Sequence, residues 1–326
     1  MDERYETQFL TPEYHKIFTG IYNDFTSSAY DVYKFEVPPL DYKSFLASVE
    51  RNLINCIILL ENKIPVAFLV YTTVTTEAIE LNLIHCLGNE DVSTKRKMLI
   101  EEFLKQTQYM GKVVCYPMVG PQGDFIAELA TYGFKFVGQA VLRFWFDKNF
   151  DCLKILNNAE LREIAPEYEL VSWNNDYKEH VVTIVQQAFE NTADAEFDPR
   201  FKTLDGVRDI IEKIVDGTYG EFLPDTATIL LHNGGVCGCC LTNITDGKIA
   251  NIPIFAIAKD HQGKGIAKHL LKRSISLLAE KNERGEREFA EINTTTETDN
   301  YPALNMYRGI GFKEDYCYPQ SYLPVK

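Results

Sequence analysis

The sequence predicts a mixed α/β fold that is built twice along the chain. Short apolar runs typical of strands alternate with longer segments in which apolar residues recur at helical spacing. The order of these elements in the first half is repeated in the second half. With 326 residues, the chain is long enough for two domains, each with its own core. We place the boundary in the polar stretch 148–169, which gives domains at 1–159 and 160–326.

The first half begins with a helix, because Thr11 is a suitable cap and Pro12 is tolerated in a first turn. Its aromatic stripe up to Tyr42 indicates core packing. The remaining elements are predicted from periodicity and turn residues. They are a helix at 44–52, a hairpin of strands 56–60 and 66–73, a strand at 80–87, a helix at 93–109, a strand at 112–116, a helix at 122–132 and a strand at 133–146.

The second half follows the same order. Asp176 is expected to cap its first helix, and Gly285 to stop a later one. The predicted elements are a strand at 170–173, helices at 176–189 and 205–217 with a turn at 197–201 between them, a hairpin of strands 227–232 and 236–243, a strand at 248–258, a helix from 266, a strand at 289–294, a helix from 300 and a closing strand from 312.

The segment 251–271 contains an apolar strand, a glycine turn and the start of an amphipathic helix. Gly263 and Gly265 allow the backbone to turn tightly and to approach a ligand closely. The amides at a helix start have no intrahelical acceptor and lie at the positive end of the helix dipole, so a phosphate is the expected partner. The dinucleotide fingerprint would need glycine at Lys268, and the Gly-Lys-Ser/Thr of nucleoside-triphosphate loops is missing.

Two motifs carry a family resemblance. Gln262-x-x-Gly265-x-Ala267 resembles the pyrophosphate-binding motif of the GNAT N-acetyltransferase superfamily. Asn300-x-x-Ala303-x-x-x-Tyr307, followed by Gly311-Phe312, resembles the second signature of that family. The motifs cover the chain from about residue 169 to the C-terminus, whereas residues 11–146 resemble the family only in the order of their elements.

The resemblance implies two tandem GNAT-like domains, each a mixed, mostly antiparallel sheet of six to seven strands flanked by helices. The first copy is then degenerate. Its corresponding turn, 88–91, carries Glu90 and Asp91, which repel a pyrophosphate, and Leu129 stands where the second copy has Tyr307. We therefore expect a scaffold or substrate-lid role for residues 1–159 and an acetyl-CoA-binding catalytic domain at 160–326.

The implied activity is transfer of an acetyl group from acetyl-CoA to a primary amine of a small molecule or peptide. Tyr307 is expected to be the general acid, because a phenol can share a proton with a thiolate of similar basicity. Glu291 is the predicted base, with Glu221, His261 and ordered water as open alternatives; solvent exposure is expected for His261. Backbone groups of the strand 254–257 would bond the pantetheine arm and polarise the thioester carbonyl. The predicted cofactor-binding residues are Ile254, Phe255, Ala256, Ile257, Gln262, Gly263, Lys264, Gly265, Ile266, Ala267, Asn300, Ala303 and Tyr307.

The acceptor is expected between residues 189 and 224, where the family places its acceptor-side helices. Asn293 lies beside the expected thioester. The predicted substrate-binding residues are Phe222, Glu221 and Asn293, and Asp198, Arg200 and Tyr219 are further candidates in the same stretch.

The composition indicates which kinds of molecule are expected to bind. The formal net charge is −14, both halves are acidic, and neither has a basic tract, so nucleic acid is not an expected partner. An acidic surface favours cationic partners such as polyamines, aminoglycosides or basic peptides. The cysteines 237, 239 and 240 alternate like a buried strand and lack a second ligand pair, so we expect burial and no metal.

The N-terminal residues lack an apolar signal core, and no run reaches the ~20 apolar residues of a membrane span. We therefore expect a cytoplasmic protein with no membrane partner. Two other functions remain open on the sequence. One is a non-catalytic acyl-CoA-binding module. The other is an aminoacyl-transferring relative of the doubled fold, for which the acidic charge is unfavourable.

Overall fold

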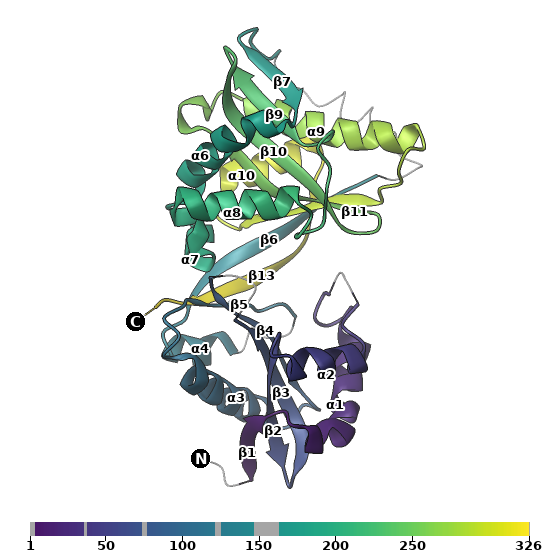
Figure 1. Cartoon of the computed structure of the whole chain (residues 1–326), viewed down its shortest axis with the longest axis vertical. Coiled ribbons are helices and arrows are strands. Elements are labelled where there is room, and N and C mark those ends of the chain that lie inside the picture. The colour runs from purple at the N-terminus through teal and green to yellow at the C-terminus, as the bar shows by residue number, and fades with distance from the viewer. Residues whose placement is uncertain (1–3, 36–37, 74–76, 121–124, 147–162, 326) are drawn as a thin grey trace. The chain divides into compact units, whose positions relative to one another are not determined.

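The computed structural model describes residues 4–35, 38–73, 77–120, 125–146 and 163–325 (Figure 1). By its contacts the chain divides into two compact units. The first comprises Met1–Val137, Glu196–Asp198 and Tyr318–Lys326, and the second comprises Gly138–Ala195 and Pro199–Cys317. No helix within the described ranges is long and apolar enough to cross a membrane.

The first unit contains a sheet with helices on both faces. Its strands lie in the order β1, β2, β3, β4, β5, β13, and all the neighbours pair antiparallel except β4 and β5. α1 and α2 cover one face, and α3 and α4 cover the other. The bounds are β1 Tyr5–Phe9, α1 His15–Ser28, α2 Tyr42–Glu50, β2 Asn55–Glu61, β3 Ile64–Thr72, β4 Ile79–Cys86, α3 Val92–Thr107, β5 Val114–Pro117 and α4 Ile126–Thr131.

The second unit repeats this arrangement. Its strands lie in the order β7, β9, β10, β11, β12, β6, with β8 beside β10, and only β11 and β12 are parallel. The bounds are β6 Lys135–Trp145, β7 Tyr168–Ser172, α6 Lys178–Phe189, α7 Asp194–Phe197, α8 Leu204–Val215, β8 Glu221–Phe222, β9 Thr228–His232, β10 Gly235–Asp246, β11 Ile249–Ile257, α9 Ile266–Glu283, β12 Glu291–Glu297, α10 Tyr301–Ile310 and β13 Lys313–Leu323.

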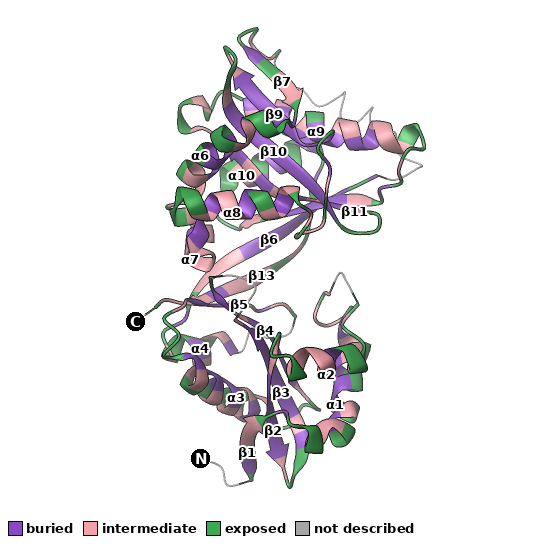
Figure 2. Ribbon diagram, viewed as in Figure 1, coloured by how far each residue is buried: buried purple, intermediate pink, exposed green. Residues whose placement is uncertain are grey.

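Two apolar cores lie on opposite faces of the second sheet. One joins the strands to α9 and α10 through buried residues such as Leu270, Ile275 and Leu278. The other joins them to α6 and α8 through residues such as Val185 and Ile211. In Figure 2 the buried residues follow the strands and the inner sides of these helices. Each fully buried aliphatic side chain contributes on the order of 1.5–3 kcal/mol, so both faces hold the strands in place.

The last strand of each copy completes the sheet of the other unit. β6 follows α4 in the chain, yet it pairs with β12 along Glu291–Glu297. β13 follows α10, yet its residues from Gln320 to Leu323 pair with β5. The predicted boundary at 159/160 lies outside the described residues, and the compact units do not follow a single cut in the chain.

Most predicted elements are present, but one strand was missed and two local predictions differ from the structure. β1 was not predicted, because as an edge strand it buries Tyr5 and little else. The first helical segment of the second half is capped by Asn174, whose side chain accepts the Asp176 amide, rather than by Asp176 itself. The predicted turn at 197–201 is largely helical, because α7 and a 3-10 helix at Pro199–Lys202 occupy it.

The prediction that the cysteines of β10 are buried is confirmed. Cys237, Cys239 and Cys240 are at most 3% exposed. Burial raises the pKa of the Cys237 thiol to about 11 and that of Cys240 to about 12, so both remain neutral thiols. In the described part of the chain, no group of three His, Cys, Asp or Glu residues is arranged to hold a metal ion.

Candidate active site

The centre of the second sheet opens where β11 and β12 separate. These parallel strands pair over only three positions and end their pairing at Asn251 and Asn293. β11 then continues to Ile257 along β10, and β12 continues to Glu297 along β6. The facing edges of Ile252–Ile257 and Thr294–Glu297, here called the open edges, therefore have no strand partner in the described chain. Open backbone edges of this kind can bind an extended ligand by strand addition.

A bulge in β11 lies at the start of its open edge. Leu241 pairs with Ile254 and Asn243 with Asn251, so β11 has one residue more than β10 between these pairs. An extra residue bends a strand and changes which face its side chains occupy. Accordingly Ile252 packs in the core with α9 and α10, whereas Ile254 packs in the core with α6 and α8. The bulge therefore directs the backbone of β11 away from β12.

The glycine turn lies directly beyond the end of β11. Gly263 and Gly265 have φ angles of +74° and +80°, and a Cβ at either position would meet no atom within 4 Å. Backbone conformation, rather than crowding, therefore favours glycine here. The side-chain amide of Gln262 donates from Nε2 to the Ile257 carbonyl at 2.9 Å and ties the turn to the strand.

The first turn of α9 is suited to an anion. It has neither a side-chain cap nor an acidic residue. Its amide donors and the positive end of the dipole of this 18-residue helix therefore face the glycine turn. The predicted residues Ile266 and Ala267 lie in this turn, and buried Ile266 anchors it to the core.

Tyr307 reaches the point of strand separation through Thr294. Its side chain is 4% exposed, and it packs against Phe312 with ring centroids 5.1 Å apart. The neighbouring Thr294 side chain lowers the pKa of the Tyr307 phenol, against the larger effect of burial. The Thr294 hydroxyl in turn donates to the carbonyl of Ile252 at 3.2 Å, on the opposite open edge. Burial raises the pKa of the Tyr307 phenol, so the phenol is protonated at neutral pH. Thr294 was not predicted, because its position opposite Ile252 depends on strand register.

α10 is built as its motif predicts. The Asn300 side chain accepts the Ala303 amide at 3.2 Å and caps the helix. Gly311, with a φ of +112°, ends it. Asn300 is exposed, and Ala303 packs against the core that contains Tyr307.

Glu291 lies where β11 and β12 are still paired, opposite Ile249. It forms an ion pair with Arg143 of β6, and Arg143 also bonds Asp315 at 2.8 Å. The side chains of Arg143 and Glu291 are 11% and 13% exposed. This carboxylate therefore balances a partly buried guanidinium, and its geometry does not favour the predicted role as a base.

Asn293 belongs to a row of asparagines at the point of separation. It is 6% exposed and is the cross-strand partner of Asn251. Asn251 donates to the Asn243 side chain at 3.3 Å, and Asn243 donates to the Tyr219 carbonyl at 2.5 Å. Only Asn293 was predicted from the sequence. Asn251 and Asn243 join it through the strand pairing, which the sequence does not display. The row places amide groups on the sheet face that α6 and α8 cover.

Glu297 ends the open edge of β12. Its carboxylate accepts the Ala193 amide at 3.3 Å, between α6 and α7. Burial raises the pKa of Glu297, and the nearby Asp194 raises it further. Burial also raises the pKa of Asp194. Neither residue was predicted, since nothing local distinguishes them from other surface acids.

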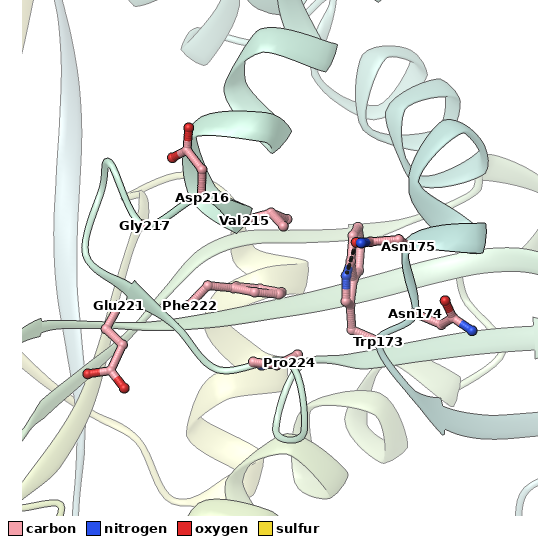
Figure 3. A pocket seen from close by; sticks show the side chains of 9 residues that line it. All are labelled: Trp173, Asn174, Asn175, Val215, Asp216, Gly217, Glu221, Phe222 and Pro224. Atoms are coloured by element: carbon pink, nitrogen blue, oxygen red, sulfur yellow. Dashed lines mark hydrogen bonds between the residues drawn. The ribbon is translucent and has the colours of Figure 1, made fainter.

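Other predicted residues have structural partners. Glu221 forms a two-point ion pair with Arg287 at 2.6 and 2.8 Å, and Phe222 lines a separate pocket (Figure 3). Arg200 donates to Asp209 and to the Tyr219 hydroxyl, which joins the segment before α8 to that helix. Asp198 belongs to the short segment that groups with the first unit.

His261 is partly exposed, and its ring also has protein partners. Its Nδ1 lies 2.8 Å from the Tyr168 hydroxyl, and its ring packs against His232 with centroids 4.8 Å apart. Burial lowers its pKa, and the nearby Lys264 lowers it further. The ring therefore helps to fix the turn that leads to α9.

The corresponding site in the first copy is occupied by protein groups. Asp91, at the start of α3, bonds Arg4 at 2.9 Å and the Tyr5 hydroxyl at 3.3 Å. The Lys95 ammonium donates to the Leu87 carbonyl at 3.2 Å. Leu129 is fully buried in the core. The Asp91 carboxylate and its partners therefore lie at the start of α3, whereas the start of α9 in the second copy has no side-chain cap.

Comparisons with known proteins agree with this geometry. Residues 224–314 match the acetyltransferase (GNAT) domain family model. No curated protein matches the chain. Among solved structures, a GCN5-related N-acetyltransferase from Sphaerobacter thermophilus has a TM-score of 0.64 at 14% identity, covering 100% of this chain and 97% of its own.

Two further structures have the same fold. A glucosamine N-acetyltransferase region of a fungal multi-domain β-N-acetylglucosaminidase has a TM-score of 0.62 at 12% identity, covering 98% of this chain and 38% of its own. A tandem GNAT protein from the clavulanic acid biosynthesis pathway has a TM-score of 0.55 at 14% identity, covering 99% of each chain. The chain thus carries a GNAT acetyltransferase domain at residues 224–314 and has the GNAT fold, in tandem form, along its length.

Proposed function

We propose that this protein is an N-acetyltransferase that transfers an acetyl group from acetyl-CoA to a primary amine of a small molecule or peptide. The observation that carries the proposal is the separation of β11 and β12, with the uncapped start of α9 beyond one open edge and the Tyr307–Thr294 pair at the point of separation. Acyl transfer is the chemistry that the GNAT fold supports.

The residues fit acetyl-CoA, which when bound supplies an activated acyl group on a sulfur leaving group. The amides of Gln262–Ala267, with the Lys264 ammonium, would hold the diphosphate, because α9 offers donors without a protein acceptor. The backbone of Ile254–Ile257 would bond the pantetheine arm as a strand partner does. Asn300 and Ala303 would line the same site from α10.

Three groups of the chain share the transfer chemistry. An amide of the Ile254–Ile257 edge stabilises the negative charge that develops on the carbonyl oxygen as the amine nitrogen attacks the carbonyl carbon. Tyr307 gives its proton to sulfur as the carbon–sulfur bond breaks, directly or through Thr294. Glu297 replaces Glu291 as our proposed base and takes the amine proton, because its raised pKa brings it closer to neutrality.

The test is release of free thiol from acetyl-CoA across a library of primary amines. For an amine that supports turnover, Tyr307→Phe and Thr294→Val should each lower kcat by about 10²-fold or more. Their double variant should lose little more than either single variant, because both act on one proton path. Tyr301→Phe is the matched control, since Tyr301 lies on the same helix and is 65% exposed. Full activity of Tyr307→Phe would remove this residue from the mechanism.

A second candidate is an acyl-CoA-binding module without transfer. It is favoured by the burial of Tyr307, which is only 4% exposed. Saturable acetyl-CoA binding with no thiol release from any amine would support it against the transferase. For the first unit we propose a scaffold or lid role, since the start of α3 is occupied by Asp91 and its partners.

A further inference from the structure

A pocket of ≈ 620 Å³ lies in the second unit, and none of its lining residues belongs to the open edges (Figure 3). Its walls come from the segment after β7, the end of α8, and β8 with the residues that follow it. Its volume is within the range of about 300–1,000 Å³ that small-molecule sites occupy. The lining residues are Trp173, Asn174, Asn175, Val215, Asp216, Gly217, Glu221, Phe222 and Pro224.

Two aromatic rings form the inner part of this pocket. Trp173 and Phe222 meet edge to face, with centroids 5.7 Å apart. The Trp173 indole nitrogen donates to the Asn175 side chain at 3.1 Å, as the dashed line in Figure 3 shows. Because its single donor is already used, the indole offers a ligand only its carbon surface and π electrons. Val215 and Pro224 add further apolar surface. The pocket therefore favours a ligand with an apolar body.

The rim of the same pocket is negative. α8 ends at Val215, so its last carbonyls place the negative end of the helix dipole there. Asp216 accepts both the amide and the hydroxyl of Thr218, and the hydroxyl bond in particular lowers its pKa. Hydrogen bonding to Arg287 lowers the pKa of Glu221. Both carboxylates are therefore ionised at neutral pH. Arg287 pairs with Glu221, whereas Lys213, the cation near Asp216 in the last turn of α8, is already paired with Asp209 at 2.9 Å.

We propose that this pocket binds a small organic cation whose ammonium group carries apolar substituents. The rings attract a cation through their π electrons. The negative charge of Asp216 and the negative end of the α8 dipole also attract it. The net charge of −14 raises the local concentration of cations around the protein. A neutral molecule of the same shape would gain only the apolar contacts. The proposal does not depend on acyl transfer, because other residues form this site.

The test uses the fluorescence of Trp173. The chain has two tryptophans, and Trp145 is 43% exposed on β6, so Trp145→Phe leaves Trp173 as the sole reporter. This variant is titrated at low ionic strength, without acetyl-CoA, with choline and with its neutral isostere 3,3-dimethyl-1-butanol. We expect saturable quenching by choline and a Kd about fivefold or more below that of the isostere. Equal affinity for the two probes, or no response to choline, would overturn the proposal.

Two variants locate the binding. Asp216→Asn and Phe222→Leu should each weaken choline binding by about threefold or more. Asp205→Asn is the control, because this carboxylate lies at the opposite end of α8 and its side chain is 96% exposed. Unchanged choline affinity in both pocket variants would refute the site. Where a variant unfolds, the salt dependence in Trp145→Phe decides instead: choline affinity should fall with added salt, and that of the isostere should not.

Discussion

Gly265 and Gly234 are a matched pair for testing the anion site. Their φ angles are +80° and +82°, and a Cβ at either position would meet no atom within 4 Å. Replacing either glycine by alanine therefore changes backbone strain without creating a clash. The left-handed conformation costs an alanine about 1–2 kcal/mol. Alanine also has less conformational freedom than glycine in the unfolded chain, and this difference offsets about 0.4–1 kcal/mol of the cost.

The net loss of about 1 kcal/mol should lower Tm by about 2–4 °C for a domain of this size class. Both variants should show it equally, because the strain is the same in both. Gly265→Asn should lose less stability than Gly265→Ala, since asparagine tolerates the left-handed region better than alanine does. These shifts are measured by thermal unfolding without ligand.

Acetyl-CoA binding should separate the two variants. In Gly265→Ala the added methyl group would project into the open space before the first turn of α9, where we propose that the diphosphate binds. Gly234 lies in the β9–β10 turn, outside the proposed site. Weakening one or two charge-assisted hydrogen bonds by about 1.4 kcal/mol in total raises Kd about tenfold. Calorimetry should find this only in Gly265→Ala. Equal acetyl-CoA affinity in the two variants would refute the assignment of this turn.

The remaining predictions concern two carboxylates. Arg143→Met should destabilise the protein by about 3 kcal/mol in urea unfolding, because it leaves Glu291 partly buried and unpaired, and adding Glu291→Leu should restore most of that loss. If Glu291→Gln abolishes transfer in a folded protein, Glu291 is the base after all. Because the folded pKa of Glu297 is raised above 4.5, its contribution favours folding at low pH and is lost as pH rises through the raised value. The Tm of Glu297→Gln minus that of the wild type should therefore be larger at pH 7 than at pH 4.5, and the variant should have a lower kcat. The same Tm difference at both pH values would contradict the raised pKa.

Local features of the site could be predicted from the sequence. The turn from Gln262 to Gly265, the cap at Asn300 and the helix stop at Gly311 each depend on a few consecutive residues. Backbone preferences and capping act within one or two turns, so the chain displays them directly. Most strands and helices were predicted for the same reason, because their apolar periodicity is local.

The remainder of the site depends on contacts between distant residues. Arg143 and Glu291 are 148 positions apart in the chain, and only the pairing of β6 with β12 brings them together. Thr294 gains its role from the Ile252 carbonyl on another strand. Trp173 and Phe222 become one pocket only when β7 and β8 are placed in the same sheet.

The sequence by itself determined the doubled α/β fold, the glycine turn before α9 and the position of Tyr307 on a capped helix. Only the tertiary structure decided that the two copies exchange their last strands, that Glu291 serves an ion pair, and that Thr294, Glu297 and the Trp173 pocket belong among the functional candidates. The physical reason is that propensity and capping are encoded in neighbouring residues, whereas strand register, burial and pKa shifts arise from groups that meet only after folding.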